Sequence, residues 1–148
     1  MTQIVLIGFM GAGKTAIGKS LAQKLQIPFL DTDQLIEKKV NLSIPKIFEE
    51  KGESFFRQQE KEVLNTIKDQ SAVISTGGGI ILSQESQALL ATFANVVFLE
   101  VDIDTLVERI KSDANNIRPL FLTHTPEAFQ QIYTDRLKKY QKASTLIV

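Results

Sequence analysis

The stretch GFMGAGKT, at residues 8 to 15, carries the clearest chemistry in the sequence. It fits the pattern G-x-x-x-x-G-K-[ST] through Gly8, Gly13, Lys14 and Thr15. Glycines let successive backbone N–H groups surround an anion, and the following helix adds its positive N-terminal end. A tight strand-to-helix turn with a chance lysine is the alternative. Because an apolar run precedes the motif and a helical pattern follows it, we predict a nucleotide phosphate site.

Two carboxylates follow the next apolar run, in the segment FLDTD at residues 29 to 33. At strand spacing, Asp31 and Asp33 would lean to the same side. The carboxyl ends of parallel strands line the ligand crevice of an α/β sheet, so these groups could hold Mg²⁺ or orient an acceptor hydroxyl and take its proton. Capping of the following helix by Asp33 is an equally good interpretation, and the two roles can coexist.

The segment FEEKGESFFRQQE, at residues 48 to 60, concentrates charge on one helical face through Glu53, Arg57 and Glu60. A surface pair of Glu53 and Arg57 would contribute only about 0.2 to 0.5 kcal/mol. The alternative is an arginine that a flanking carboxylate aims at an anionic substrate, since guanidinium binds carboxylates through two N–H donors.

Three consecutive glycines in STGGG, at residues 75 to 79, end another apolar run. Glycines in a row are costly in conformational entropy. The sequence leaves two interpretations open, a flexible turn or a backbone that a ligand must touch.

Short apolar runs alternate with helical patterns and must position these residues. The expected strands are residues 3–8, 27–31, 71–76, 95–101 and 144–148. The expected helices are residues 14–25, 35–40, 44–51, 53–68, 84–93, 103–112 and 126–142. This alternation predicts an α/β fold with a parallel sheet covered on both faces, in a single domain of residues 1–148. The polar stretch 112–125 is long enough to be a functional loop.

Composition excludes several classes of function. Seventeen Lys and Arg balance 17 Asp and Glu, which argues against broad binding to nucleic acid or anionic membranes. Without cysteine there is no disulfide, thiolate metal site or cysteine nucleophile. The N-terminus lacks the basic region of a signal peptide, and no apolar stretch approaches the roughly 20 residues of a membrane span, so we expect a soluble cytoplasmic protein. No N-K-x-D motif of P-loop GTPases is present, which favours a small kinase.

Together these motifs resemble the shikimate kinase family over nearly the whole chain. The resemblance is carried by GFMGAGKT at 8–15, DTD at 31–33, GESFFRQQE at 52–60, GGG at 77–79, RPL at 118–120 and Arg136 ahead of Y…A. It implies a three-layer α/β/α fold like that of nucleoside monophosphate kinases, with a five-stranded parallel sheet. It also implies transfer of the ATP γ-phosphate to the 3-hydroxyl of shikimate, in aromatic amino-acid biosynthesis. We expect a monomer.

On the donor side, the resemblance assigns the ATP phosphates to Gly11, Ala12, Gly13, Lys14, Thr15 and Ala16. Lys14 would stabilise the transferring group, and Thr15 and Asp31 would hold Mg²⁺. Residues 112–125 would form a lid that excludes water, from which Arg118 would meet the phosphates as a catalytic residue, and Arg109 would lie against the adenine.

On the acceptor side, the resemblance implies that Asp33 binds the shikimate hydroxyls and orients the attacking one, as a catalytic residue beside Lys14. Arg57 and Arg136 would hold the shikimate carboxylate, and the Gly78 N–H would meet a substrate oxygen.

Three features depart from the family pattern. The lid reads RPLF where the family usually has RPLL, a packing change that should be tolerated, and His124 in the lid is expected to be solvated. Relatives usually continue past the last strand into an adenine-side loop and a final helix, so one sheet face is expected to be less covered.

Two other functions are open: a sister kinase acting on gluconate or a nucleoside monophosphate, and a nucleotide-binding module without catalysis. Arg57 together with the three glycines favours a small carboxylated polyol over a nucleotide as acceptor. The intact set of Lys14, Asp33, Arg57 and Arg136 argues against a module that has lost its chemistry.

Overall fold

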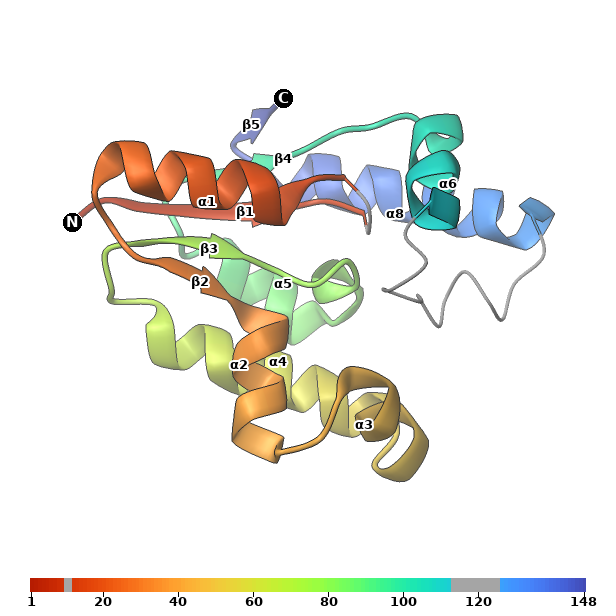
Figure 1. The fold of residues 1–148 in the computed structure, drawn as a ribbon, viewed down its shortest axis with the longest axis horizontal. Helices are drawn as coiled ribbons and strands as arrows, with labels where there is room; N and C mark the ends of the chain where they lie inside the picture. The colour runs from red at the N-terminus through yellow and green to blue at the C-terminus, as the bar shows by residue number, and fades with distance from the viewer. Residues whose placement is uncertain (10–11, 113–125) are drawn as a thin grey trace.

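A computed structural model describes residues 1–9, 12–112 and 126–148 (Figure 1). Its five strands are β1 (Gln3–Ile7), β2 (Phe29–Asp31), β3 (Ala72–Ser75), β4 (Val96–Phe98) and β5 (Leu146–Ile147). All neighbouring strands pair in parallel, in the order β2-β3-β1-β4-β5. This order places β1, which leads into the phosphate loop, in the middle of the sheet. The predicted five-stranded parallel sheet is confirmed.

Helices cover both faces of the sheet, as predicted. They are α1 (Lys14–Leu25), α2 (Thr32–Val40), α3 (Ile44–Glu50), α4 (Glu53–Ile67), α5 (Gln84–Leu90), α6 (Ile103–Ser112) and α8 (Pro126–Ala143), with a 3-10 turn η1 at Ile80–Leu82. Side chains alternate between the two faces of β1 because of the strand's period of two. Leu6 packs with Ala22 of α1 on one face, and Val5 and Ile7 pack with α4, α5 and α8 residues on the other.

A separate apolar cluster joins the helices that carry the acceptor residues. Ile36 of α2, Ile47 of α3, and Phe56 and Val63 of α4 are buried together. These three helices form a unit beside the sheet edge at β2 (Figure 1). Their packing fixes the direction in which α2 and α4 present polar side chains to the strand ends.

Several predicted bounds were wrong by a few residues. The second strand begins at Phe29 rather than residue 27. The helix expected over 35–40 begins at Thr32, because Asp31 caps it, and η1 was not predicted. No helix within the described ranges is long and apolar enough to cross a membrane.

Candidate active site

The phosphate loop leads from β1 into α1 through a glycine in the left-handed region. Gly13 has a φ of 94° and stands at the N-cap of α1, where it leaves the helix N-terminus without a side-chain cap. Lys14 is buried, and its ammonium donates to the carbonyls of Gly8 at 2.6 Å and Phe9 at 3.0 Å. Thr15 and Ala16 are exposed at the start of the helix. The loop therefore presents an open helix N-terminus beside a lysine that backbone dipoles hold in place.

Arg109 of α6 lies beside this loop. Its Nη1 is 3.9 Å from the position that a Cβ on Gly13 would occupy. The structure thus brings one predicted nucleotide-side arginine to the phosphate loop itself. Gly11, Arg118, His124 and the lid from residue 113 to 125 lie outside the described residues.

Asp31, the last residue of β2, and Asp33, two residues beyond it, have different positions from those predicted. Asp31 is the N-cap of α2, and its Oδ1 accepts from the backbone N–H groups of Asp33 at 2.9 Å and Gln34 at 3.2 Å. Asp33 lies in the first helical turn, so it is neither the cap nor a strand residue. The predicted cap at Asp33 is wrong because the strand ends two residues earlier. The helix instead turns the Asp33 side chain toward the turn formed by Gly77, Gly78 and Gly79, called the glycine turn below.

Arg57 of α4 lies between two carboxylates of its own helix. Its Nη1 donates to Glu60 Oε1 at 2.8 Å, and its Nη2 donates to Glu53 Oε2 at 3.3 Å. The Glu60 side chain is 1% exposed, whereas that of Glu53 is 60% exposed. The guanidinium also lies over the rings of Phe48 and Phe56, at 5.9 and 5.2 Å from their centroids. Both interpretations from the sequence are therefore present, a surface pair and an arginine held by a buried carboxylate.

Two of the three glycines, Gly77 and Gly79, make room for these charged groups. A Cβ on Gly79 would lie 2.5 to 2.7 Å from three guanidinium atoms of Arg57. A Cβ on Gly77 would lie 2.7 Å from Asp33 Oδ1 and 3.2 Å from Glu60 Oε2. A side chain larger than hydrogen at either position would push apart the cluster of charged groups formed by Asp33, Arg57 and Glu60. The glycine turn is thus packed against the cluster. This packing is a reason for glycine other than the flexible turn or the ligand contact that the sequence left open.

Arg136 of α8 lies close enough to these charged groups to lower the pKa of Glu60. Only 9% of its surface is exposed, and its guanidinium lies 5.4 Å from the centroid of the Phe9 ring. Burial lowers the pKa of Arg136, and Arg57 adds to this effect. One helical turn further on, the Tyr140 hydroxyl donates to the carbonyl of Gly78. Arg57 and Tyr140, which lies one helical turn from Arg136, thus contact the same glycine turn.

The buried carboxylates have raised pKa values. Burial, together with the charge of Asp31, raises the pKa of Asp33 to about 6, while Lys14 and Arg57 lower it. Burial raises the pKa of Glu60 to about 7 despite its bond to Arg57. Asp33 Oδ1 and Glu60 Oε2 are buried without a hydrogen-bond partner in the described part of the chain. A desolvated carboxylate between cations can orient a hydroxyl and accept its proton.

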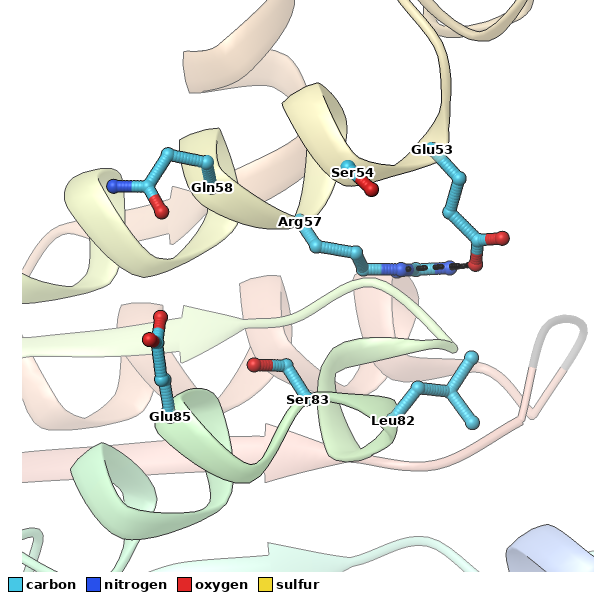
Figure 2. Close-up of a pocket in the computed structure, with 7 residues that line it drawn as sticks. All are labelled: Glu53, Ser54, Arg57, Gln58, Leu82, Ser83 and Glu85. Atoms are coloured by element: carbon cyan, nitrogen blue, oxygen red, sulfur yellow. Dashed lines mark hydrogen bonds and ion pairs between the residues drawn. The ribbon is translucent and has the colours of Figure 1, made fainter.

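A pocket of about 330 Å³ borders the cluster (Figure 2). Its lining residues are Glu53, Ser54, Arg57, Gln58, Leu82, Ser83 and Glu85. Figure 2 shows the Arg57 side chain between α4 and η1, with its bond to Glu53 dashed. The pocket shares this ion pair with the cluster but does not include Asp33 or Arg136.

The donor set fits a magnesium ion brought in with a nucleotide. The Thr15 hydroxyl is exposed at the loop, and Asp31 uses Oδ1 in capping α2. These are hard oxygen ligands of the kind that Mg²⁺ prefers beside substrate phosphates. Within residues 1–9, 12–112 and 126–148, no group of three or more His, Cys, Asp or Glu side chains is arranged to hold a metal.

Sequence reasoning missed two residues of the cluster. Glu60 was placed on the correct helical face, but its burial under the glycine turn was not predicted. Tyr140 follows Arg136 by four positions, so it lies on the same side of α8, and this spacing could have indicated a shared partner.

Comparison with known proteins places the chain in a family. The family model described as "Shikimate kinase" matches residues 10–148. The chain is 41% identical to the shikimate kinase of Enterococcus faecalis, over all of this chain and 88% of that protein. Its structure is similar to that of the shikimate kinase from Acinetobacter baumannii in complex with shikimate, with a TM-score of 0.92 and 35% identity over all of this chain and 83% of the other. The shikimate kinase structure from Aquifex aeolicus has a TM-score of 0.85 and 37% identity, over 99% of this chain and 86% of the other. The chain belongs to the shikimate kinase family.

Proposed function

We propose that this protein transfers the γ-phosphate of ATP to the 3-hydroxyl of shikimate, and that it does so as a single-domain monomer in the cytoplasm. The observation that carries the proposal is the convergence of Asp33, Arg57 and Arg136 on one glycine turn near Lys14. Shikimate carries a carboxylate and three hydroxyls, which match the buried guanidinium of Arg136, the partly buried guanidinium of Arg57 and the carboxylate of Asp33.

On the donor side, the backbone of residues 11–16 surrounds the ATP phosphates. Lys14 moves its ammonium from the Gly8 and Phe9 carbonyls to the transferring phosphoryl group, whose charge it stabilises. Thr15 and Asp31 would hold Mg²⁺, which would supply further positive charge to the phosphates. Arg109 of α6 contributes to binding ATP, and Arg118 of the lid contributes charge to the ATP phosphates. The lid excludes water from the reacting groups.

On the acceptor side, Arg57 and Arg136 bind the shikimate carboxylate, and Glu60 keeps Arg57 oriented. The Gly78 N–H meets a substrate oxygen. Asp33 accepts a hydrogen bond from the 3-hydroxyl and takes its proton as the oxygen attacks phosphorus. Phosphoryl transfer depends mainly on positioning and charge stabilisation, so a carboxylate with a pKa of about 6 is a sufficient base.

ADP release with ATP and Mg²⁺ tests the proposal, using shikimate, gluconate, AMP or CMP as the acceptor. We expect release above the background ATPase rate only with shikimate. Activity with gluconate alone would indicate the sister kinase, and no activity with any acceptor would favour a non-catalytic module. Product mass and phosphorus NMR would locate the new phosphate on the 3-oxygen.

A further inference from the structure

The glycine turn holds its three carbonyl groups in two different ways. The Gly77 and Gly79 carbonyls accept backbone N–H groups of η1, at 3.2 and 3.0 Å. The Gly78 carbonyl instead accepts the hydroxyl of Tyr140, which comes from α8, 62 positions away. One peptide unit of the turn is therefore oriented by a distant helix rather than by the turn itself.

The Tyr140 ring is fixed by packing, which sets the direction of its hydroxyl. It is buried, stacked on Phe98 at 5.0 Å between centroids, and meets Phe9 edge-on at 6.4 Å. Burial raises the pKa of Tyr140 far above its ordinary value, while the nearby Arg136 cation opposes this effect. The hydroxyl consequently remains a proton donor over the whole pH range in which enzymes are usually assayed.

A fixed carbonyl also fixes the N–H group of the next residue, because the peptide unit is planar. Tyr140 therefore sets the orientation of the Gly79 N–H as well as that of the Gly78 carbonyl. Glycine by itself permits many orientations of this unit. Gly79 lies directly against the Arg57 guanidinium, so a rotated peptide unit would alter the surface that Arg57 and the turn present together.

We propose that Tyr140 is a positioning residue for the acceptor: it holds the peptide unit between Gly78 and Gly79 against Arg57, one helical turn from Arg136. α8 then contributes two groups to the acceptor site, the guanidinium of Arg136 and the hydroxyl of Tyr140, which orders the glycine turn. This inference rests on the proposed function, since it names a further determinant of the same shikimate site.

Tyr140→Phe tests the inference because it removes the hydroxyl and keeps the ring. We expect KM for shikimate to rise about tenfold, the scale of one lost buried hydrogen bond, with kcat and KM for ATP changed less than about twofold. Tyr133→Phe is the matched control. Tyr133 is also on α8, and its hydroxyl donates to a backbone carbonyl, that of Val101, at 2.8 Å. This control should lower the melting temperature without moving KM for shikimate.

The outcomes separate the inference from the function on which it rests. An unsubstituted protein that does not phosphorylate shikimate would remove the proposed function, and the inference with it. An active protein whose Tyr140→Phe variant keeps its KM for shikimate would overturn the inference alone. Equal rises in KM for both tyrosine variants would overturn it too, because they would indicate a general loosening of α8.

A spectroscopic measurement does not depend on the folding of Tyr140→Phe. The chain has two tyrosines, so 3-fluorotyrosine incorporated into Tyr133→Phe labels Tyr140 alone. We expect its ¹⁹F resonance to shift on titration with shikimate and to change much less with ADP. A resonance that does not respond to shikimate would contradict the proposed role.

Discussion

The donor and acceptor halves of the site are built in different ways. The phosphate loop is one continuous stretch, and its lysine rests on carbonyls five and six positions earlier in the chain. The acceptor half draws Asp33, Arg57, Gly78 and Arg136 from four separate elements. A contiguous motif can form its geometry locally, whereas the acceptor half exists only when the whole sheet and its helices have assembled.

The two halves also stabilise charge differently. The Lys14 ammonium donates to two neutral backbone carbonyls. In the acceptor half, opposite charges face each other: Arg57 lies between Glu53 and Glu60, and the pKa values of the buried carboxylates of Asp33 and Glu60 are raised. We therefore expect donor substitutions to affect phosphoryl transfer, and acceptor substitutions to affect substrate affinity and the pH response.

Lys14→Met should have the largest effect. Methionine keeps the length of the side chain and removes the charge, so we expect kcat to fall by about 10³-fold, as for other lost transition-state cations. ADP release measures the rate, and calorimetric titration with shikimate measures acceptor binding. Shikimate binding should persist, and its loss would show that the two halves do not form independently.

Asp33→Asn should have the next largest effect. Asparagine keeps the shape but cannot take the proton, so we expect kcat to fall by about 10²-fold while ATP binding is largely unchanged. Steady-state kinetics and titration with a non-hydrolysable ATP analogue separate the two quantities. A near-normal kcat in this variant would exclude Asp33 as the base.

These halves also differ in how well the sequence predicts them. The bounds of α1 at Lys14–Leu25 and α6 at Ile103–Ser112 were predicted as observed, because they follow from local periodicity. Arg57 was correctly placed on a face with Glu53 and Glu60, since three- and four-residue spacings determine helix faces.

What the sequence could not predict depends on contacts between distant segments. Which aspartate caps α2 is decided by where β2 ends, and pairing with β3 ends that strand at Asp31. The burial of Glu60 and the bond from Tyr140 to Gly78 join residues that only the assembled sheet brings together. No spacing along the chain encodes the short approach of Gly77 and Gly79 to charged side chains.

Glu60→Gln and Glu53→Gln compare the two carboxylates that hold Arg57. Glu60 is buried and bonded at 2.8 Å, so its neutral replacement should weaken the orientation of Arg57 and raise KM for shikimate about tenfold. Glu53 is largely exposed and 3.3 Å away, so we expect a change of less than about twofold. Initial rates at varied shikimate measure both. Equal effects would mean that burial does not distinguish the two partners.

The pH dependence of folding tests the charge of the acceptor half without any substrate. Burial raises the pKa of Glu60 to about 7 in the folded protein from an ordinary value near 4.5, with Arg57 and Arg136 lowering it and Asp33 raising it further. Between these values the folded state binds a proton that the unfolded state does not. The contribution of Glu60 to the free energy of unfolding is therefore most favourable below pH 4.5 and is lost as the pH rises through 7, by roughly 3 kcal/mol.

Urea unfolding at pH 5 and pH 8 measures the contribution of Glu60 to the free energy of unfolding, as the difference between wild type and a Glu60 variant. Relative to wild type, Glu60→Gln should gain stability as the pH rises, because glutamine does not ionise. Glu62→Gln, on the same helix but with a partly exposed side chain paired to Lys39, is the control that should keep the wild-type slope. If both variants follow the wild-type slope, Glu60 is ionised at pH 5, and Arg57 then outweighs burial in setting the charge of the acceptor half.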